Sequence, residues 1–313
     1  MLADVTTDLV LAVDVGGGTT KGEITDADGN VLCADTVETP YGEAAFEAIE
    51  TLGLRLLDEL TPDLRDRVAR AAVILPGLVD PDRAIALFAA NLGWRNVKVG
   101  SRFTDRWGLP VLIDHDVTVA GWAEWRYGAG RGHDDVCVLI IGTGISGTLS
   151  VGGRLVRASA GQSGVAQAGE YGHIPVRYRD GLPCPCGNVG CVETVASGPA
   201  IARAYAARTG REISGADVVF AALDTDPEAH AVVDDAVDAL AAGLLGVVHA
   251  SCPELIVLGG GLARAGTVLT SALQARLTTL LRVAPVPRIA LGEFGIRAGL
   301  IGAAQLARTG SLR

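Results

Sequence analysis

The chain has 313 residues, of which 49% are hydrophobic and 20% charged, and 26 basic against 36 acidic side chains give a formal net charge of -10. This composition is typical of a globular protein and excludes a disordered chain or a small disulfide-stabilised scaffold. The acidic balance, with no basic stripe, argues against nucleic acids and anionic membranes as partners.

The start of the chain and its apolar runs predict a cytoplasmic location. Residues 1–11 contain two aspartates and no basic residue, unlike the positively charged start of a secretory signal. The longest apolar runs, such as residues 239–248, are shorter than the about 20 residues that a membrane-spanning helix needs. At about 150 residues per domain, the length suggests two domains.

Three apolar, β-branched runs end abruptly in glycines, and the chain has 41 glycines in all. Continuous apolar runs of this length predict strands that are buried on both faces. They cover residues 9–15, 136–141 and 255–258, before the glycines at 16–18, 142 and 144, and 259–261.

The first two runs are each followed by a second strand, a tight-turn signal and a third strand. The first hairpin covers residues 22–25 and 31–33 around Asp28-Gly29. The second covers residues 145–151 and 155–156 around Gly152-Gly153. This repetition predicts two related α/β halves, each with a sheet that opens as a β-meander.

Helical periodicity and two further strands account for much of the remaining chain. The predicted helices cover residues 44–60, 118–127, 198–207, 234–250 and 298–307, and the predicted strands cover 71–75 and 111–114. We expect a small N-terminal domain of residues 1–116 plus 298–313, in which the last helix packs back on the first sheet. Residues 117–297 would form a larger C-terminal domain, with a cleft between the two.

The glycine loops predict nucleotide binding, because backbone N–H groups without Cβ obstruction can surround a phosphate. One such loop could be an ordinary turn, but two loops in repeated contexts and a third glycine turn favour a nucleotide. The first loop also offers hydroxyls, a cation and a carboxylate that could orient hydrated Mg²⁺. The candidate residues are Asp14, Gly16, Gly17, Gly18, Thr19, Lys21, Gly142, Thr143, Gly144, Gly259, Gly260 and Gly261.

None of the three loops has a Walker A sequence or a clean G-x-G-x-x-G opening a helix. Both the P-loop and the Rossmann interpretations are therefore disfavoured. A strand, glycine loop and hairpin repeated in two halves is the pattern of the actin-like, sugar kinase and Hsp70-like (RNase H-like) fold.

A cluster of one histidine and three cysteines predicts a structural zinc site. His173, Cys184, Cys186 and Cys191 have the spacing H-x10-C-x-C-x4-C. Four nitrogen and sulfur ligands complete a tetrahedral shell and leave no position for a reacting water. The alternative is three free cysteines in a loop beside a surface histidine. Glu170 precedes His173 by three residues, so on a helical turn the two side chains would share a face.

Asp116 is the candidate general base. It follows the strand predicted at 111–114 and precedes the helix predicted from Thr118, and the carboxyl ends of strands face the ligand crevice in α/β folds. Phosphoryl transfer to an alcohol needs a group that takes the hydroxyl proton. Asp114 is the competing candidate, and Asp116 could instead cap the helix.

Across nearly the whole chain, these motifs resemble the ROK family of bacterial sugar kinases and sugar-responsive repressors. The matching segments are D-V-G-G-G-T-T-K at Asp14, L-P-G-L-V-D at Leu75, N-L-G-W at Asn91, H-D-V at His115, I-G-T-G-I-S-G at Ile141, G-E-Y-G-H at Gly169, C-P-C-G-N-V-G-C-V-E at Cys184 and G-G-G at Gly259.

The resemblance implies a kinase that uses ATP and Mg²⁺ to phosphorylate the 6-hydroxyl of a hexose, with Asp116 as the base. A glucokinase is the leading interpretation, and the alternatives are kinases of N-acetylglucosamine, mannose or fructose. A homodimer is also implied. Positions that correspond to sugar contacts are Gly77, Asn91, His115, Asp116, Glu170, His173 and Glu193, and His173 also corresponds to a zinc ligand.

Four residues depart from the family pattern. His115 and Thr118 stand where asparagines are usual, Gly18 where a threonine is usual, and Ser146 where a glycine is usual. The usual asparagine at position 115 touches sugar hydroxyls, so its replacement bears on the choice of sugar.

A non-catalytic sugar sensor is the alternative to a kinase. The family's repressors carry a helix-turn-helix before the first phosphate loop, and we expect none here because Asp14 lies near the start.

Overall fold

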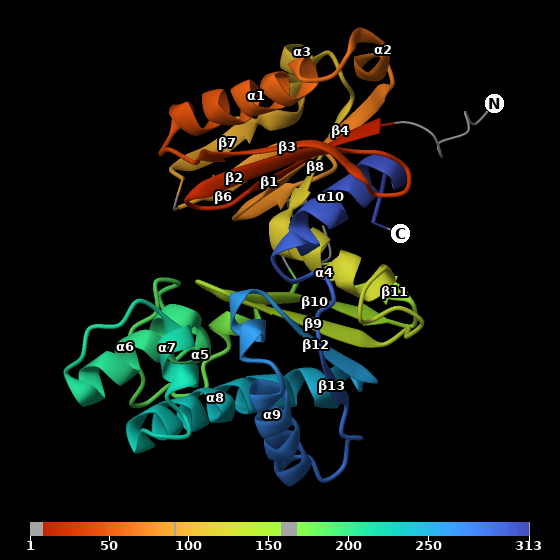
Figure 1. Ribbon diagram of the computed structural model, residues 1–313. Helices are drawn as coiled ribbons and strands as arrows, with labels where there is room; N and C mark the ends of the chain where they lie inside the picture. The colour runs from red at the N-terminus through yellow and green to blue at the C-terminus, as the bar shows by residue number, and fades with distance from the viewer. Residues whose placement is uncertain (1–8, 91, 158–167, 313) are drawn as a thin grey trace. The chain divides into compact units, whose positions relative to one another are not determined.

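The computed structural model describes residues 9–90, 92–157 and 168–312, and Figure 1 shows its ribbon. These residues form two compact units. The first contains residues 9–90, 92–123, 157 and 297–312, and the second contains residues 124–156 and 168–296. The division falls inside helix α4 (Asp116–Arg126), whereas the sequence placed it at residue 116. A continuous helix crosses the division, so a change in sequence pattern does not mark it.

The first unit is built on a five-stranded sheet in the order β3-β2-β1-β4-β8. Strands β1, β2 and β3 are antiparallel neighbours, and β1, β4 and β8 are parallel. The strands are β1 (Leu9–Val15), β2 (Thr19–Thr25), β3 (Val31–Glu38), β4 (Val68–Leu75) and β8 (Val111–His115).

Helices cover both faces of this sheet, as the continuous apolar strands predicted. Because side chains alternate along a strand, Leu11 and Val13 of β1 pack in the core beneath helix α1 (Glu43–Asp58) and helix α3 (Val99–Trp107). Val10 instead packs against helix α10 (Ala298–Thr309) on the opposite face. The prediction that the last helix returns to the first sheet is thus confirmed.

The second unit repeats the topology of the first, with a sheet in the order β11-β10-β9-β12-β13. Its first three strands again pair antiparallel, and β9, β12 and β13 are parallel. They are β9 (Val136–Ile141), β10 (Ile145–Val151), β11 (Arg154–Leu155), β12 (Leu255–Gly259) and β13 (Arg288–Leu291). The predicted repeat of a β-meander in two halves is therefore present.

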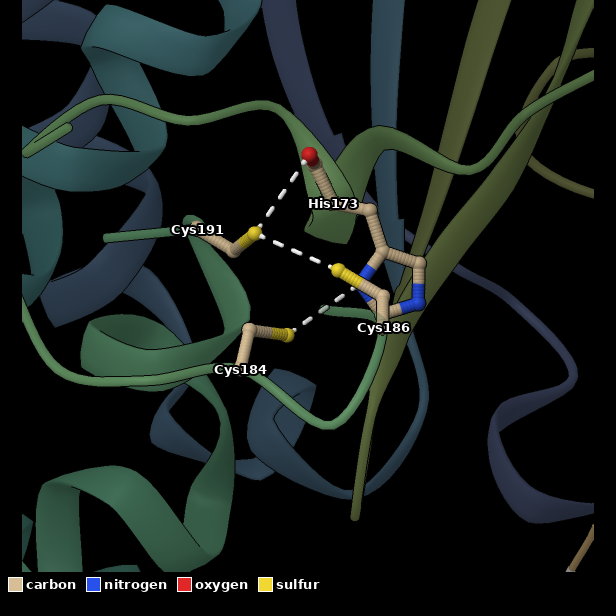
Figure 2. A group of neighbouring side chains, drawn as sticks. All are labelled: His173, Cys184, Cys186 and Cys191. Atoms are coloured by element: carbon tan, nitrogen blue, oxygen red, sulfur yellow. Dashed lines mark hydrogen bonds between the residues drawn. The ribbon is translucent and has the colours of Figure 1, made fainter. Parts of the chain in front are cut away.

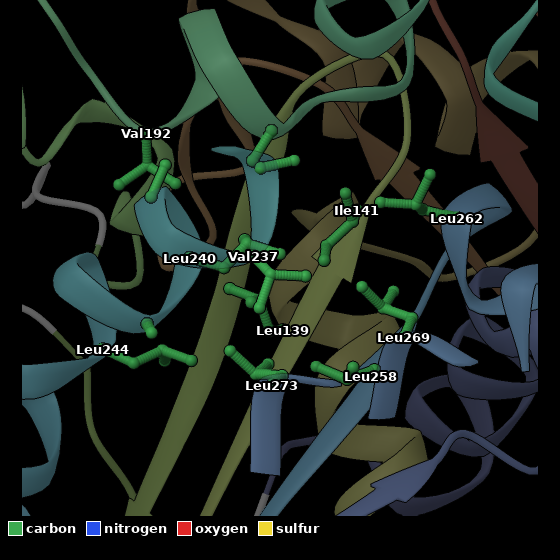
Figure 3. Packing of buried hydrophobic residues seen from close by; sticks show 14 of the residues in the cluster. Leu139, Ile141, Val192, Val237, Leu240, Leu244, Leu258, Leu262, Leu269 and Leu273 are labelled. Atoms are coloured by element: carbon green, nitrogen blue, oxygen red, sulfur yellow. The ribbon is translucent and has the colours of Figure 1, made fainter. Parts of the chain in front are cut away.

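The core of the second unit lies between this sheet and long helices (Figure 3). Leu139 of β9 and Leu258 of β12 pack against Leu240 of helix α8 and Leu273 of helix α9. The helices are α5 (Glu193–Ala196), α6 (Gly198–Thr209), α7 (Ala216–Ala221), α8 (Pro227–Ser251) and α9 (Thr267–Leu280). Three short 3₁₀ turns are η1 (Tyr171–His173), η2 (Gly261–Ala265) and η3 (Gly295–Arg297).

A small second sheet in the first unit was not predicted from the sequence. It has the order β5-β6-β7, with β5 (Leu78–Asp80), β6 (Ile85–Ala89) and β7 (Trp94–Lys98), and a short helix α2 (Pro62–Arg65) precedes β4. Trp94 of β7 stacks on Phe46 of α1 with ring centroids 4.3 Å apart. This long-range contact stabilises strands that are too short to give a periodic signal.

Among the helices of the described residues, none is both long and apolar enough to span a bilayer.

Candidate functional site

The first glycine loop joins β1 to β2 and leaves room for a ligand. The Gly16 N–H donates to the Thr19 carbonyl at 2.9 Å, and the Gly18 carbonyl accepts from the Thr39 N–H at 3.0 Å. A Cβ at Gly18 would meet no heavy atom within 4 Å. The backbone of the loop is therefore open to an approaching anion.

Asp14 and Lys21 face each other across the base of this loop, as register partners on β1 and β2. Burial raises the pKa of Asp14 to about 6, and the charge of Lys21 opposes the shift. A partly buried carboxylate beside a cation is a donor set that fits hydrated Mg²⁺ and phosphate. The sequence assigned these two residues the same role.

The second glycine loop is joined to the start of helix α6. The Gly142 carbonyl accepts from the Gly198 N–H at 3.0 Å, and the Gly142 N–H donates to the Gly144 carbonyl at 2.9 Å. Ser197 caps α6 by accepting a hydrogen bond from the Ala200 N–H. The positive end of the α6 dipole consequently lies beside the glycine loop, where it favours an anion.

A cavity of about 890 Å³ in the second unit adjoins this loop. Gly142, Thr143 and Gly261, three of the predicted phosphate residues, line it. Gly144, Gly259 and Gly260 are not among its lining residues; Gly260 has a φ of 81° and would place a Cβ 2.4 Å from the Ile141 carbonyl oxygen. This glycine is required by close backbone packing.

Most residues of the cavity wall were not predicted from the sequence, because they belong to helices and connections far apart in the chain. The additional lining residues are Gly198, Pro199, Ala202, Arg203, Ser214, Gly215, Ala216, Asp217, Phe220, Ala221, Leu262, Arg264, Ala265 and Val268. The one local signal was the Ser-Gly-Pro sequence that starts α6 directly after α5.

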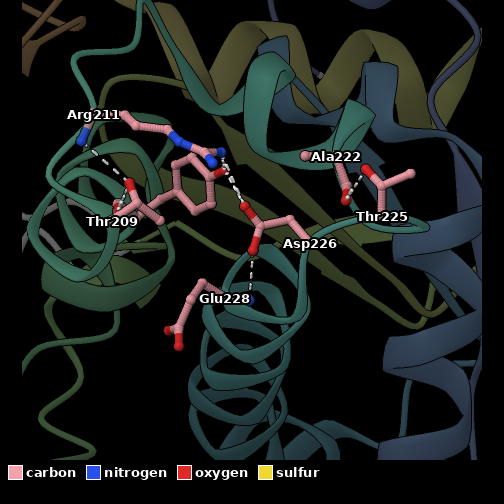
Figure 4. Close-up of polar contacts among 7 residues, drawn as sticks. Thr209, Arg211, Ala222, Thr225, Asp226 and Glu228 are labelled. Atoms are coloured by element: carbon pink, nitrogen blue, oxygen red, sulfur yellow. Dashed lines mark hydrogen bonds and ion pairs between the residues drawn. The ribbon is translucent and has the colours of Figure 1, made fainter.

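A polar network supports the loop between α6 and α7 that forms one side of this cavity (Figure 4). Asp226 accepts from the Tyr205 hydroxyl at 2.6 Å and from Arg211 at 3.1 Å. Its other oxygen accepts from the Glu228 N–H at the start of α8. One carboxylate thus ties the end of α6, the following loop and α8 together.

Asp116 is the first residue of α4, directly after β8. Its Oδ1 accepts from the Val117 N–H at 2.7 Å, and its side chain is 25% exposed. Asp114 is only 8% exposed and forms an ion pair with Arg157, and burial raises its pKa. Of the two candidate bases, Asp116 is the one that solvent or a substrate can reach.

His115 uses both ring nitrogens within the first unit. Its Nδ1 lies 3.0 Å from Thr118 Oγ1 and its Nε2 lies 3.0 Å from Asp116 Oδ1. Burial, together with the Arg157 charge, lowers the pKa of the imidazole to about 4. The ring is therefore neutral near pH 7.

The other predicted sugar residues fall in both units. Gly77, in the first unit, has a φ of 86° and would place a Cβ 2.2 Å from the Phe88 carbonyl oxygen, so only glycine fits. Asn91 lies outside the described residues. In the second unit, Glu193 Oε2 accepts from the Ile145 N–H at 2.8 Å and so anchors the second glycine loop.

Glu170 lies beside both His173 and Glu193. Its Oε2 is 3.9 Å from His173 Nε2. Burial raises the pKa of Glu170, the charge of His173 opposes this shift, and the charge of Glu193 adds to it. The structure thus brings these three predicted residues together in the second unit, with hydrogen-bonding groups of the kind that sugar hydroxyls need.

The predicted zinc ligands converge as Figure 2 shows. The ligand atoms of His173, Cys184, Cys186 and Cys191 all lie within 4.8 Å of one another. Cys184 Sγ is 3.5 Å from His173 Nδ1, and Cys186 Sγ is 3.7 Å from Cys191 Sγ. These are close to the roughly 3.5 to 3.8 Å edges of a tetrahedron with zinc–ligand bonds of about 2.0 to 2.3 Å. The donor set fits Zn²⁺, with Nε2 of His173 directed to Glu170.

The chain is similar to known sugar kinases and to a related transcriptional regulator. A model of the ROK family matches residues 10–310. A glucokinase of Streptomyces coelicolor is 32% identical over 96% of this chain and 98% of its own. A ROK family glucokinase of Streptomyces griseus, solved with glucose and AMPPNP, is 31% identical with a TM-score of 0.82, covering 96% of this chain and 99% of its own.

A ROK family transcriptional regulator, a homologue of the Escherichia coli MLC protein, has the same fold. It is 26% identical with a TM-score of 0.82, and the match covers 96% of this chain and 78% of the regulator. The fold alone therefore does not separate a kinase from a regulator.

Proposed function

The chain belongs to the ROK family, and we propose that it is an ATP-dependent hexose kinase that phosphorylates the sugar 6-hydroxyl, with glucose as the preferred sugar. The observation that carries this proposal is the match to a glucokinase over 96% of this chain and 98% of the relative. Kinases of N-acetylglucosamine, mannose and fructose are the alternatives within the same reaction.

Asp116 is the general base of the proposed reaction. It accepts the proton of the 6-hydroxyl as that oxygen forms a bond to the γ-phosphorus of ATP. The bond from the γ-phosphorus to its bridging oxygen breaks, and ADP leaves. Exposure supports the choice of Asp116 over Asp114, since Asp114 is buried and paired with Arg157.

The nucleotide is assigned to the two glycine loops and the cavity of about 890 Å³ in the second unit. That volume lies within the range of small-molecule sites. Its wall combines the second glycine loop, the start of α6 and apolar side chains such as Leu262. When bound near Asp14, Mg²⁺ would neutralise charge on the phosphates.

The sugar contacts expected from the sequence stay proposals. They are Glu170, His173 and Glu193 in the second unit and Gly77, Asn91, His115 and Asp116 in the first. His173 would hold Zn²⁺ through Nδ1, together with three cysteines, and would thereby be fixed for contact through Nε2. The zinc is structural in this proposal. The homodimer and the cytoplasmic location expected from the sequence remain predictions.

The proposal is tested by measuring ADP release with ATP, Mg²⁺ and a panel of hexoses, for the wild type, Asp116→Asn and Asp114→Asn. We expect glucose to give the highest kcat/KM, and Asp116→Asn to lower kcat by about 10² to 10⁴, the usual contribution of a general base. Asp114→Asn should lower thermal stability while keeping kcat within about tenfold, because it removes a buried ion-pair partner.

Two outcomes would contradict this assignment. If no hexose stimulates ADP release although hexoses still bind, the protein is a sugar sensor. If Asp116→Asn keeps full activity, another group takes the proton.

A further inference from the structure

The second glycine loop, residues 142–144, is held at both ends by one short segment of the chain. At the start of the loop, the Gly142 carbonyl accepts from the Gly198 N–H at 3.0 Å. At its end, Oε2 of Glu193 accepts from the Ile145 N–H at 2.8 Å. Glu193 is the first residue of α5 and Gly198 is the first residue of α6, so the same stretch of sequence supplies both contacts.

The Glu193 carboxylate also lies directly against Gly144. A Cβ at position 144 would be 2.7 Å from Glu193 Oε2, which is closer than two such atoms approach in proteins. The close contact between the loop and this carboxylate therefore requires a glycine at position 144. This explains a glycine that does not line the neighbouring cavity.

These contacts leave two N–H groups of the loop for a ligand. The Gly142 N–H donates inside the loop to the Gly144 carbonyl, and the Ile145 N–H donates to Glu193. Within the described residues, the N–H groups of Thr143 and Gly144 have no protein acceptor. Backbone N–H groups bind an anion well when a loop already presents them together, so the conformation of this loop bears on its affinity for phosphate.

The backbone that carries Glu193 is itself fixed by hydrogen bonds. The Val192 N–H donates to the Ile174 carbonyl at 3.0 Å, and the Thr194 hydroxyl donates to the Cys191 carbonyl at 2.7 Å. The Glu193 side chain is partly buried. Little conformational freedom is then left to lose when the carboxylate holds the loop.

We propose that Glu193 is a positioning residue, which holds the second glycine loop in the conformation that binds the nucleotide phosphates. The inference rests on the proposed kinase function, which assigns the nucleotide to this loop. It is separate from the sugar contact expected at Glu193, because it requires only the contact of Oε2 with the Ile145 N–H and no sugar.

Two neutral substitutions separate the hydrogen bond from the charge. A carboxylate and a phosphate repel each other, so removing the charge at position 193 favours nucleotide binding by itself. Glu193→Gln and Glu193→Met both remove the charge and keep a side chain of similar length. The glutamine carbonyl can still accept from the Ile145 N–H, whereas the methionine thioether is only a weak acceptor.

Binding of AMPPNP with Mg²⁺, in the absence of any hexose, measures the effect on the phosphates. We expect Glu193→Met to bind AMPPNP about tenfold more weakly than Glu193→Gln, the effect of one lost hydrogen bond. Adenosine carries no phosphate, so its Kd should differ less than about twofold between the two variants. The proposal is overturned if both variants bind AMPPNP equally, or if the affinity for adenosine falls as much as that for AMPPNP.

Hydrogen exchange of the Ile145 amide tests the contact without a ligand. This amide should exchange slowly in the wild type and in Glu193→Gln, and about tenfold faster or more in Glu193→Met. Gly144→Ala, whose Cβ would displace the carboxylate, should speed the exchange as well. The Leu139 amide in β9 should exchange at one rate in all of these proteins, so that a change at Ile145 reports the local contact.

Equal exchange of Ile145 in all of these proteins would overturn the proposal. If Ile145 and AMPPNP behave as expected but no hexose is phosphorylated, the kinase function fails while the positioning role of Glu193 stands.

Discussion

Neighbouring side chains around Asp116 have separate roles that the sequence alone could not distinguish. Asp114 and Asp116 follow the same strand, and each was a reasonable candidate base. Asp114 is buried and forms an ion pair with Arg157, whereas Asp116 is partly exposed. The contact between Asp116 and His115 was equally invisible, because it depends on the side-chain conformations at the start of α4.

The lowered pKa of His115 predicts a pH dependence of stability. Between pH 6.5 and about 4, the unfolded chain protonates this histidine and the folded chain does not. The unfolded state then binds more protons, so stability falls as the pH is lowered through this window. The contribution lost by about pH 4 is on the order of 3 kcal/mol.

Urea unfolding of the wild type and His115→Gln at several pH values measures this effect. The free energy of unfolding of the wild type, minus that of His115→Gln, should fall by on the order of 3 kcal/mol between pH 7.5 and 4. His230→Gln, at an exposed position on α8, is the control for removing an imidazole elsewhere. A difference between wild type and His115→Gln that does not vary with pH would contradict the prediction.

Strands and helices with strong patterns were predictable, but some of their limits were wrong. Helix α8 begins at Pro227 and not at residue 234, and β3 continues to Glu38 and not to residue 33. The apolar runs became β1, β9 and β12, since burial on both faces requires apolar side chains at every position. The strands β5 to β7 were missed because they are short and depend on long-range contacts such as Phe46 with Trp94. The cavity wall at α6 and α7 was missed for a similar reason.

The loop that carries Cys184, Cys186 and Cys191 should unfold more easily without the zinc that we propose it binds. We expect elemental analysis to find about one zinc per chain. Cys184→Ser or Cys191→Ser should remove it and lower the melting temperature by on the order of 10 °C, because a structural zinc contributes directly to folding. Cys252→Ser, at an exposed cysteine outside the cluster, is the matched control. A wild-type protein that is folded and active but contains no zinc would rule the site out.

The cavity beside α6 should control the affinity for ATP. Ala202 lines the cavity, and Ala204 is exposed on the same helix outside the lining. Ala202→Phe should raise KM for ATP about tenfold or more by occupying ligand space, with less than a twofold change in KM for the hexose. Ala204→Phe should leave both constants unchanged. Equal effects of the two substitutions on KM for ATP would contradict the assignment of this cavity.

The architecture of the chain as a whole follows from a repeated pattern that was visible in the sequence. Each unit contains three antiparallel strands followed by two parallel ones, and the glycine loop lies between the first two strands of each sheet. The sequence did not predict that the division between the units lies within α4, or which residues of α6 and α7 line the cavity. Both features depend on contacts between segments far apart in the chain.

We propose that the chain transfers a phosphoryl group from ATP to the 6-hydroxyl of a hexose. Phosphorus-31 NMR of the product formed from glucose, ATP and Mg²⁺ tests it most directly. We expect a phosphomonoester whose phosphorus signal is split by the two hydrogens on C6, formed in proportion to ADP. A phosphorus coupled to the single hydrogen on C1, or ADP formed with inorganic phosphate and no sugar phosphate, would contradict it.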